Sequence, residues 1–230
     1  MEDMITCYMC DEEATSFEHV PPKCLFPEQK DLPEGIDLRK SLITVPSCEV
    51  HNSQKSDDDE YLLYCLAMSI PSNNVGKDHF LSKVIRAVKR NPSLIKKLLH
   101  NSHNAQAENL STNEVFETIG FQVDDLRFDK AIEQLSRALY FHHFGKKSNG
   151  QLKIYPNFLL SMEDNYKETN EKIAEMDIMA EKLFSEENYY GSNPEVFKYC
   201  AVDTGIGQPK FLRLYFYGGN RVTVIFVDED

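Results

Sequence analysis

Three short stretches decide how the first quarter of the chain folds: Cys7-Tyr8-Met9-Cys10, Glu18-His19-Val20-Pro21-Pro22 and Cys48-Glu49-Val50-His51-Asn52. The outer two each hold a pair of soft ligands with two residues between them, a spacing that lets a knuckle or a helical turn aim both side chains at one point. Four such ligands suit one tetrahedral, structural Zn²⁺. The predicted zinc ligands are Cys7, Cys10, Cys48 and His51. His19, Glu18 and Asn52 are left over, and a zinc site does not need them.

The residues around these stretches predict two strands followed by a helix. Met4–Cys10 indicates a short strand that runs into a zinc knuckle, and Pro21-Pro22 ends the segment that contains His19. Ser41–Val45 is apolar and β-branched, which is typical of a strand. Ser47 is a suitable N-cap for a helix that carries Cys48 and His51 on its first turn. This arrangement is the ββα-metal, or treble-clef, module.

The rest of the chain predicts helices first and strands last. Helical periodicity covers Tyr61–Ile70, Phe80–Leu99 with an interruption near Asn91-Pro92, Phe128–Phe144 closed by Gly145, and Met162–Phe184. The β-rich runs are Val196–Val202, Phe211–Tyr217 and Val222–Val227, the last two joined by a tight-turn signal at Gly218-Gly219-Asn220. The polar stretch His100–Ser111 indicates a linker. We therefore predict an α+β protein with a ββα-metal module in residues 1–72. A helical middle and a C-terminal antiparallel β-sheet follow in residues 73–230.

Composition favours a folded protein outside the membrane. The chain has 230 residues with 41% hydrophobic and 27% charged side chains, which is ordinary for a globular domain. No apolar run approaches the roughly 20 residues of a membrane helix, and the N-terminus lacks the basic and apolar regions of a secretory signal. Six cysteines are too few for a disulfide scaffold. We expect a cytoplasmic protein with no membrane partner.

Charge is segregated along the chain. The net charge is −12, and residues 1–60 hold 15 acidic and 5 basic residues. Residues 77–100 hold seven basic residues against Asp78 alone. A local basic stretch of this kind can contact a phosphate backbone even when the whole molecule is acidic. The alternative is an ordinary solvated helix face.

Taken together, the three stretches resemble the HNH endonuclease family. The order is Cys-x2-Cys, then Glu-His-Val-x-Pro, then Cys-x2-His-Asn followed by Lys55, and the resemblance spans roughly residues 5–60. It implies that His19 is the general base and that Glu18, where the family more often has Asp, helps to hold a divalent cation. Asn52 would be the second protein ligand of that cation, Mg²⁺ or Mn²⁺, and Lys55 would contact a phosphate. The resemblance also implies the structural zinc site, with His51 where Cys is more usual.

One family feature has no clear counterpart here. The middle Asn of the HNH pattern, which orients the catalytic histidine, is missing, and Ser41 and Thr44 are the nearest candidates for its role. The resemblance implies metal-dependent hydrolysis of DNA, and family-level analogy links such proteins to anti-phage defence. Two other functions stay open: a non-catalytic zinc adaptor that contacts protein or nucleic acid, and an RNA-cleaving toxin. The C-terminal half could bind a partner protein or a second copy.

Several other polar residues have plainer explanations. His142 and His143 are adjacent on a predicted helix, so they point about 100° apart and converge poorly on one ion. Cys24, Cys65 and Cys200 lack partners at ligand spacing and are expected to be buried thiols. The acidic run Asp57–Glu60 is expected to be solvated helix surface.

Overall fold

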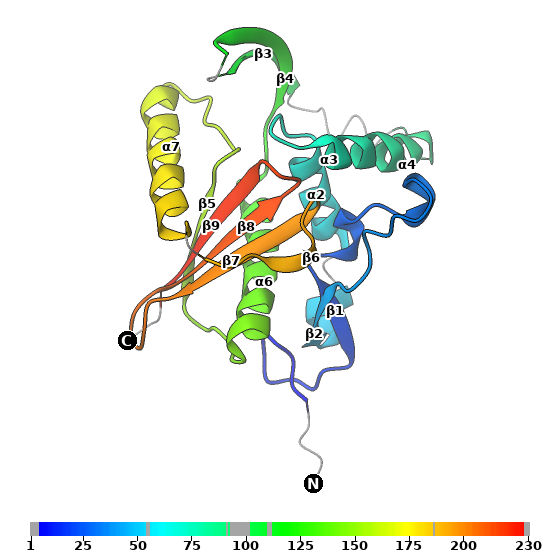
Figure 1. Ribbon diagram of the computed structural model, residues 1–230, viewed down its shortest axis with the longest axis vertical. Coiled ribbons are helices and arrows are strands. Elements are labelled where there is room, and N and C mark those ends of the chain that lie inside the picture. Colours follow the sequence, from blue (N-terminus) through cyan, green and yellow to red (C-terminus); the bar gives the residue numbers. More distant parts are fainter. Residues whose placement is uncertain are drawn as a thin grey trace.

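The computed structural model mixes helices with strands, and it describes residues 5–53, 56–90, 92, 102–109, 112–185 and 187–227. Its largest element is an antiparallel five-stranded sheet of order β5-β9-β8-β7-β6, drawn from yellow-green to red in Figure 1. The strands are β5 (Gln151–Pro156), β6 (Tyr190–Asn193), β7 (Phe197–Asp203), β8 (Lys210–Phe216) and β9 (Asn220–Val227). The predicted C-terminal sheet and the hairpin between its last two strands are confirmed.

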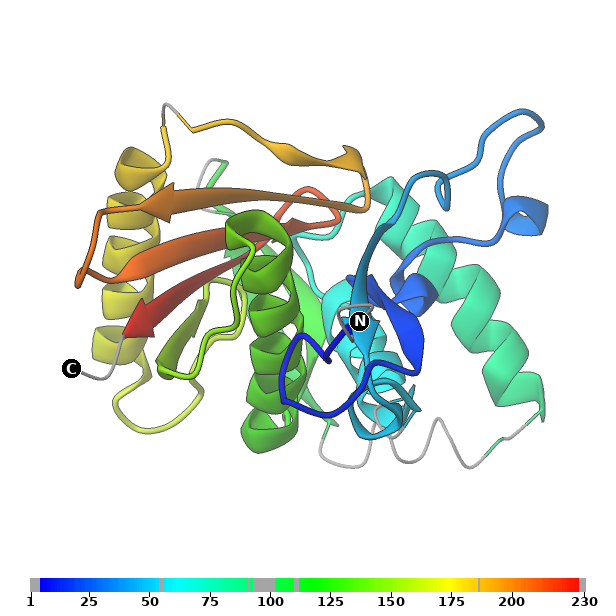
Figure 2. The same cartoon turned by 90° about the horizontal axis from the view of Figure 1, so that it is seen from below.

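Two long helices cover the two faces of this sheet (Figures 1 and 2). Helix α6 (Asp125–Phe144) begins at the N-cap Asp124 and ends at Gly145, whose φ of 68° few other residues adopt. It packs apolar residues such as Ile132 and Leu139 into the main core. Helix α7 (Tyr166–Leu183) lies on the other face. There Ala180 and Phe184 pack with Cys200 and Tyr215 of the sheet in a smaller buried cluster. Both predicted helices are therefore confirmed.

The N-terminal segment forms a hairpin followed by helices. Strands β1 (Ser16–Val20) and β2 (Ile43–Ser47) pair antiparallel, and helices α1 (Glu49–Ser53) and α2 (Ser56–Ala67) follow. The connection between the strands contains the 3-10 turns η1 (Lys23–Leu25) and η2 (Gln29–Asp31). The predicted strand at Met4–Cys10 is reduced to one bridge between Thr6 and Glu13, because bends form the knuckle there.

The middle of the chain holds a basic helical segment and a second hairpin. We name α3 (Asn74–His79), the π-helical turn η3 (Phe80–Val84) and α4 (Ile85–Arg90) together the basic helix. The interruption was expected near Asn91-Pro92: α4 ends at Arg90 and Pro92 lies in a turn, while Asn91 and the predicted helical residues 93–99 lie outside the described residues. Strands β3 (Ser102–Asn109) and β4 (Glu114–Phe121) pair as a two-stranded hairpin at the top of Figure 1. The prediction of a linker at His100–Ser111 was wrong.

One buried cluster joins the N-terminal hairpin to the C-terminal sheet. Val20 and Val45 of the hairpin belong to the same core as Phe216 and Val224 of the sheet. Hydrogen bonds cross the same boundary: the Tyr217 hydroxyl donates to the Leu25 carbonyl at 2.5 Å. Both predicted parts of the chain thus contribute to one hydrophobic core. Across the described ranges, no helix has the length and apolar character to cross a membrane.

Candidate metal centre and the two faces of the hairpin

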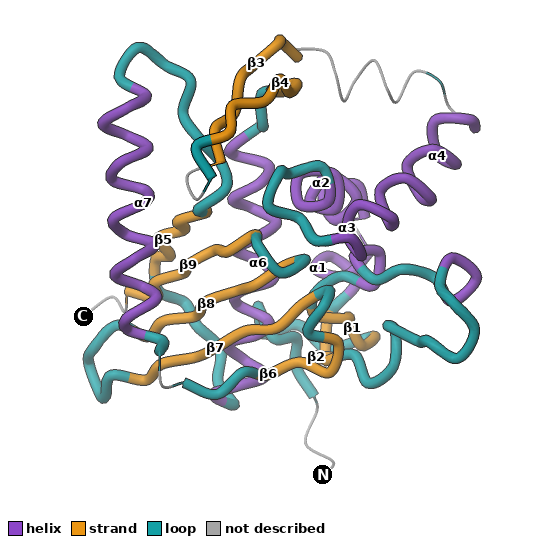
Figure 3. Tube along the Cα trace, turned by 45° about the horizontal axis from the view of Figure 1, so that its top comes forward, coloured by secondary structure: helices purple, strands orange, loops and turns teal. Residues whose placement is uncertain are grey.

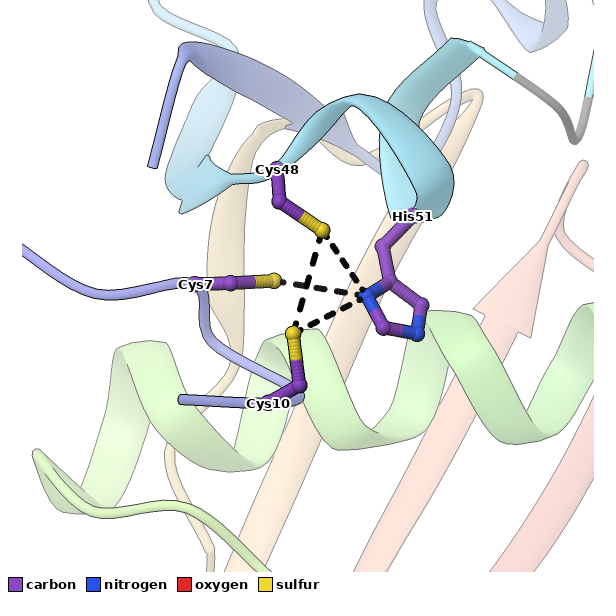
Figure 4. Close-up of side chains that lie close together, drawn as sticks. All are labelled: Cys7, Cys10, Cys48 and His51. Atoms are coloured by element: carbon purple, nitrogen blue, oxygen red, sulfur yellow. Dashed lines mark hydrogen bonds between the residues drawn. The ribbon is translucent and has the colours of Figure 1, made fainter. Parts of the chain in front are cut away.

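The four predicted zinc ligands lie together at one point, as Figure 4 shows. The Sγ atoms of Cys10 and Cys48 are 3.8 Å apart, and Nδ1 of His51 lies 3.5, 3.5 and 3.2 Å from the Sγ atoms of Cys7, Cys10 and Cys48. Tetrahedral zinc with normal bond lengths requires S–S separations of about 3.8 Å and S–N separations of about 3.5 Å. The cluster therefore fits Zn²⁺ in ligand type and in spacing.

Local backbone structure explains why these ligands converge. The Met9 amide points at Cys7 Sγ at 3.5 Å, and the Cys7 amide donates to the Glu12 carbonyl at 2.9 Å, which closes the knuckle. Burial acts to raise the pKa of Cys7, but backbone hydrogen bonds from Cys48, Met9 and Cys10 lower it to about 7. Amide hydrogens aimed at sulfur stabilise a thiolate, the form that binds metal. His51 lies in the first turn of α1 and Cys48 immediately precedes it, whereas Ser47, the expected N-cap, is the last residue of β2.

The inner face of the hairpin carries Glu18, and Asn52 of α1 lies against the same face. Glu18 is only 3% exposed, and its carboxylate accepts a hydrogen bond from the Ser47 hydroxyl at 3.3 Å. The Asn52 amide donates to the Ser16 hydroxyl at 2.8 Å, and Ser16 is the register partner of Ser47. Burial, and next the Glu18 charge, raise the pKa of Tyr8. The two predicted cation ligands therefore lie on one face, linked through a pair of serines.

The outer face carries His19. Successive side chains on a strand point to opposite faces, so His19 lies opposite Glu18, and it is half-buried. Burial first, and then the positive charges of Lys23 and Arg39, lower the pKa of His19 below its usual value. The lowered pKa favours the neutral imidazole at pH 7. Thr44 is the register partner of His19, whereas Ser41 precedes β2.

The connection that carries Lys23 and Arg39 is held from two sides. The carbonyl of Cys24 lies 2.9 Å from His79 Nε2 and 3.2 Å from Lys83 Nζ, both on the basic helix. From the sheet side, Asn193 donates to the Lys40 carbonyl at 3.0 Å, beside the Tyr217 bond to Leu25. The residues next to Lys23 and Arg39 are thus fixed by parts of the chain far away in sequence.

The other predicted site residues have varied surroundings. Lys55 lies outside the described residues. In the acidic run, Asp58 pairs with Arg127 and Lys130, and the predicted role as solvated surface holds for the exposed Asp57. His143 Nδ1 lies 3.3 Å from the Tyr199 hydroxyl, while His142 is exposed.

The remaining thiols are mostly buried. Cys65 and Cys200 are buried, as expected, whereas Cys24 is only half-buried and donates to the Asp59 carbonyl. Within the described ranges, the zinc cluster is the one group of three or more metal-binding side chains.

Sequence reasoning missed the residues that surround His19. Lys23 stands four positions after His19, a hint that was present in the sequence, but Arg39 is twenty residues away and carries no motif. Comparison with known proteins adds no further guide, since no protein family, curated protein or solved structure matches the chain.

Proposed function

We propose that this chain is a metal-dependent endonuclease that hydrolyses phosphodiester bonds, with DNA as its substrate. One observation carries the proposal: His19 is half-buried, its pKa is lowered by burial and by the charges of Lys23 and Arg39, and it lies on a hairpin flanked by a Cys3His cluster. A general base must be unprotonated at working pH and close to its substrate. The outer face of the hairpin supplies both conditions for a polyanion.

His19 and the two cationic residues of the connection, Lys23 and Arg39, each have a role in this proposal. The neutral His19 imidazole accepts the proton of the attacking water. Lys23 and Arg39 attract the phosphate and stabilise the negative charge that grows on its oxygens. The Nε and one terminal nitrogen of Arg39 donate hydrogen bonds to the Phe26 carbonyl, at 3.1 and 2.9 Å. These two bonds hold the guanidinium in place.

Glu18 and Asn52 would hold the divalent cation. Carboxylate and amide oxygens are the hard donors that Mg²⁺ and Mn²⁺ prefer, and the two residues share the inner face. When bound, such a cation neutralises charge on the leaving oxygen. The burial of Glu18 keeps that carboxylate below the protein surface.

The direct test is cleavage of supercoiled plasmid in Mg²⁺ or Mn²⁺ by wild type and by His19→Ala. His142→Ala is the matched control, because His142 is an exposed histidine at the end of α6. We expect cutting by wild type and His142→Ala, and cutting slowed about 100-fold or more by His19→Ala. Cutting at the same rate by all three would remove His19 from catalysis. A parallel arm with single-stranded RNA distinguishes DNA cleavage from an RNA-cleaving activity.

A second candidate is a zinc-dependent adaptor without catalysis. The observation in its favour is the same burial of Glu18, whose carboxylate is already engaged by Ser47. An adaptor predicts that added Mg²⁺ or Mn²⁺ changes neither stability nor activity, and that wild type leaves plasmid and RNA intact. The nuclease proposal predicts a cation-dependent product in at least one arm.

A further inference from the structure

The basic helix lies against the same connection that supplies the cations around His19. His79 and Lys83 both contact the Cys24 carbonyl, one residue after Lys23. Arg86 forms a two-pronged ion pair with Asp31, with both N–O distances 2.6 Å. Figures 1 and 3 both show α4 alongside the connection between η1 and β2. The helix is therefore fixed against the connection that carries Lys23 and Arg39.

The charge that the helix presents to solvent is strongly one-sided. It holds five basic residues, Lys77, Lys83, Arg86, Lys89 and Arg90, against the single acidic residue Asp78. Arg86 is used by Asp31, but Lys77, Lys89 and Arg90 are exposed. In a chain of net charge −12, a concentrated basic surface needs a reason, and attraction of a polyanion supplies one.

We infer that the basic helix is a phosphate-contacting surface that guides a nucleic-acid strand to His19. The inference rests on the proposed function, because it identifies the basic helix as the surface that binds the nucleic-acid substrate of the proposed nuclease. From Lys83 to Arg90 the helix extends about 10 Å, roughly the rise of three nucleotides along one strand. Lys89 and Arg90 would thus contact phosphates beyond the one that is cleaved. Such contacts position a backbone and carry no base specificity.

The test is binding of labelled oligonucleotides in the His19→Ala background, where cutting is slowed, measured by fluorescence anisotropy over a series of salt concentrations. Duplex DNA, single-stranded DNA and RNA of one sequence are the probes. The test variant is Lys89→Glu with Arg90→Glu. The matched control is Lys167→Glu with Lys182→Glu, the same change in net charge placed on exposed residues of α7.

We expect the Lys89/Arg90 pair to lower the slope of log affinity against log salt by about 2, close to one unit for each lost phosphate contact. The control pair should leave that slope unchanged. Equal effects of the two pairs would overturn the inference, because they would show only long-range repulsion. Absence of binding to all three probes would also overturn it.

The inference and the proposed function can fail separately. Binding that depends on Lys89 and Arg90, without cutting by the wild type, would support the surface and contradict the nuclease. Cutting by the wild type with an unchanged KM in the Lys89/Arg90 variant would support the nuclease and contradict the surface.

Discussion

The metal-type cluster at the ends of the β1–β2 hairpin and the groups proposed for catalysis differ in how completely their chemistry is assembled. On the zinc side, four ligands stand at the separations of a tetrahedral ion. Around Glu18 and His19, the groups proposed for catalysis are divided between a buried face and an outer face. The difference teaches that local spacing can build each ligand pair of a structural site, after which the pairing of β1 with β2 brings the two pairs together. A catalytic site here depends on support from distant parts of the chain.

The largest effect should come from breaking the zinc side. Cys48→Ser, or removal of metal with a strong chelator, should unfold the N-terminal hairpin and the core that it shares with the sheet. Structural zinc in small peptides is worth about 10–16 kcal/mol, which equals or exceeds the whole stability of a typical domain. Circular dichroism and metal analysis provide the measurement. Cys24→Ser, at a half-buried thiol outside the cluster, should keep one zinc per chain; a folded, zinc-free Cys48→Ser protein would contradict the account.

Acid should weaken the support for the outer face through His79. Burial lowers the pKa of His79 to about 4 from an ordinary value of 6.5. Between these two values, His79 is protonated in the unfolded chain but not in the native protein. The free energy of unfolding therefore falls as the pH drops from about 6.5 to about 4. The loss is about 3 kcal/mol at most.

His79→Gln isolates this effect, because its neutral amide can still donate to the Cys24 carbonyl. Urea unfolding of wild type and variant across this pH range is the measurement. The difference between their stabilities should shrink toward acid pH, and parallel curves would exclude His79 as the cause.

The inner face can be tested without disturbing the zinc. Glu18→Gln preserves the shape of the side chain but removes the charge that a hard cation needs. We expect zinc content to stay at one per chain and cation-dependent cleavage to fall about 100-fold, as for loss of a metal contact worth a few kcal/mol. The measurement is the plasmid cleavage rate of wild type and Glu18→Gln as a function of Mg²⁺ and Mn²⁺ concentration. Unchanged cation dependence would place the cation elsewhere.

The smallest effect should come from the support on the sheet side. Tyr217→Phe removes the hydroxyl that donates to the buried Leu25 carbonyl, at a cost of about 1–3 kcal/mol. Cleavage should slow as the residues next to Lys23 loosen. Tyr189→Phe, at a side chain 54% exposed, is the control and should change stability by less than about 0.5 kcal/mol. Equal melting temperatures for the two variants would argue against this support.

The sequence was informative where short-range patterns act. Two ligand pairs with x2 spacing predicted the zinc cluster, and the helix ending at Gly145 followed from its periodicity and its C-cap. The β3–β4 hairpin was missed for a physical reason: Val115 and Phe116 both stay exposed on it, so neither face shows the apolar alternation that marks a half-buried strand. The surroundings of His19 could not be predicted, because they depend on tertiary packing. Arg39 influences the pKa of His19 from twenty residues away, and Tyr217 holds the connection through the Leu25 carbonyl.

The most direct measurement is the plasmid cleavage rate of His19→Ala, determined on preparations whose zinc content and melting temperature are measured alongside those of wild type. The account predicts one zinc per chain, an unchanged melting temperature and a rate lowered by about 100-fold or more, the usual contribution of a general base. Such a result would separate the outer face, proposed to carry the chemistry, from the Cys3His cluster, proposed to hold the fold through zinc. A fully zinc-loaded His19→Ala protein that cuts as fast as wild type would contradict the central claim.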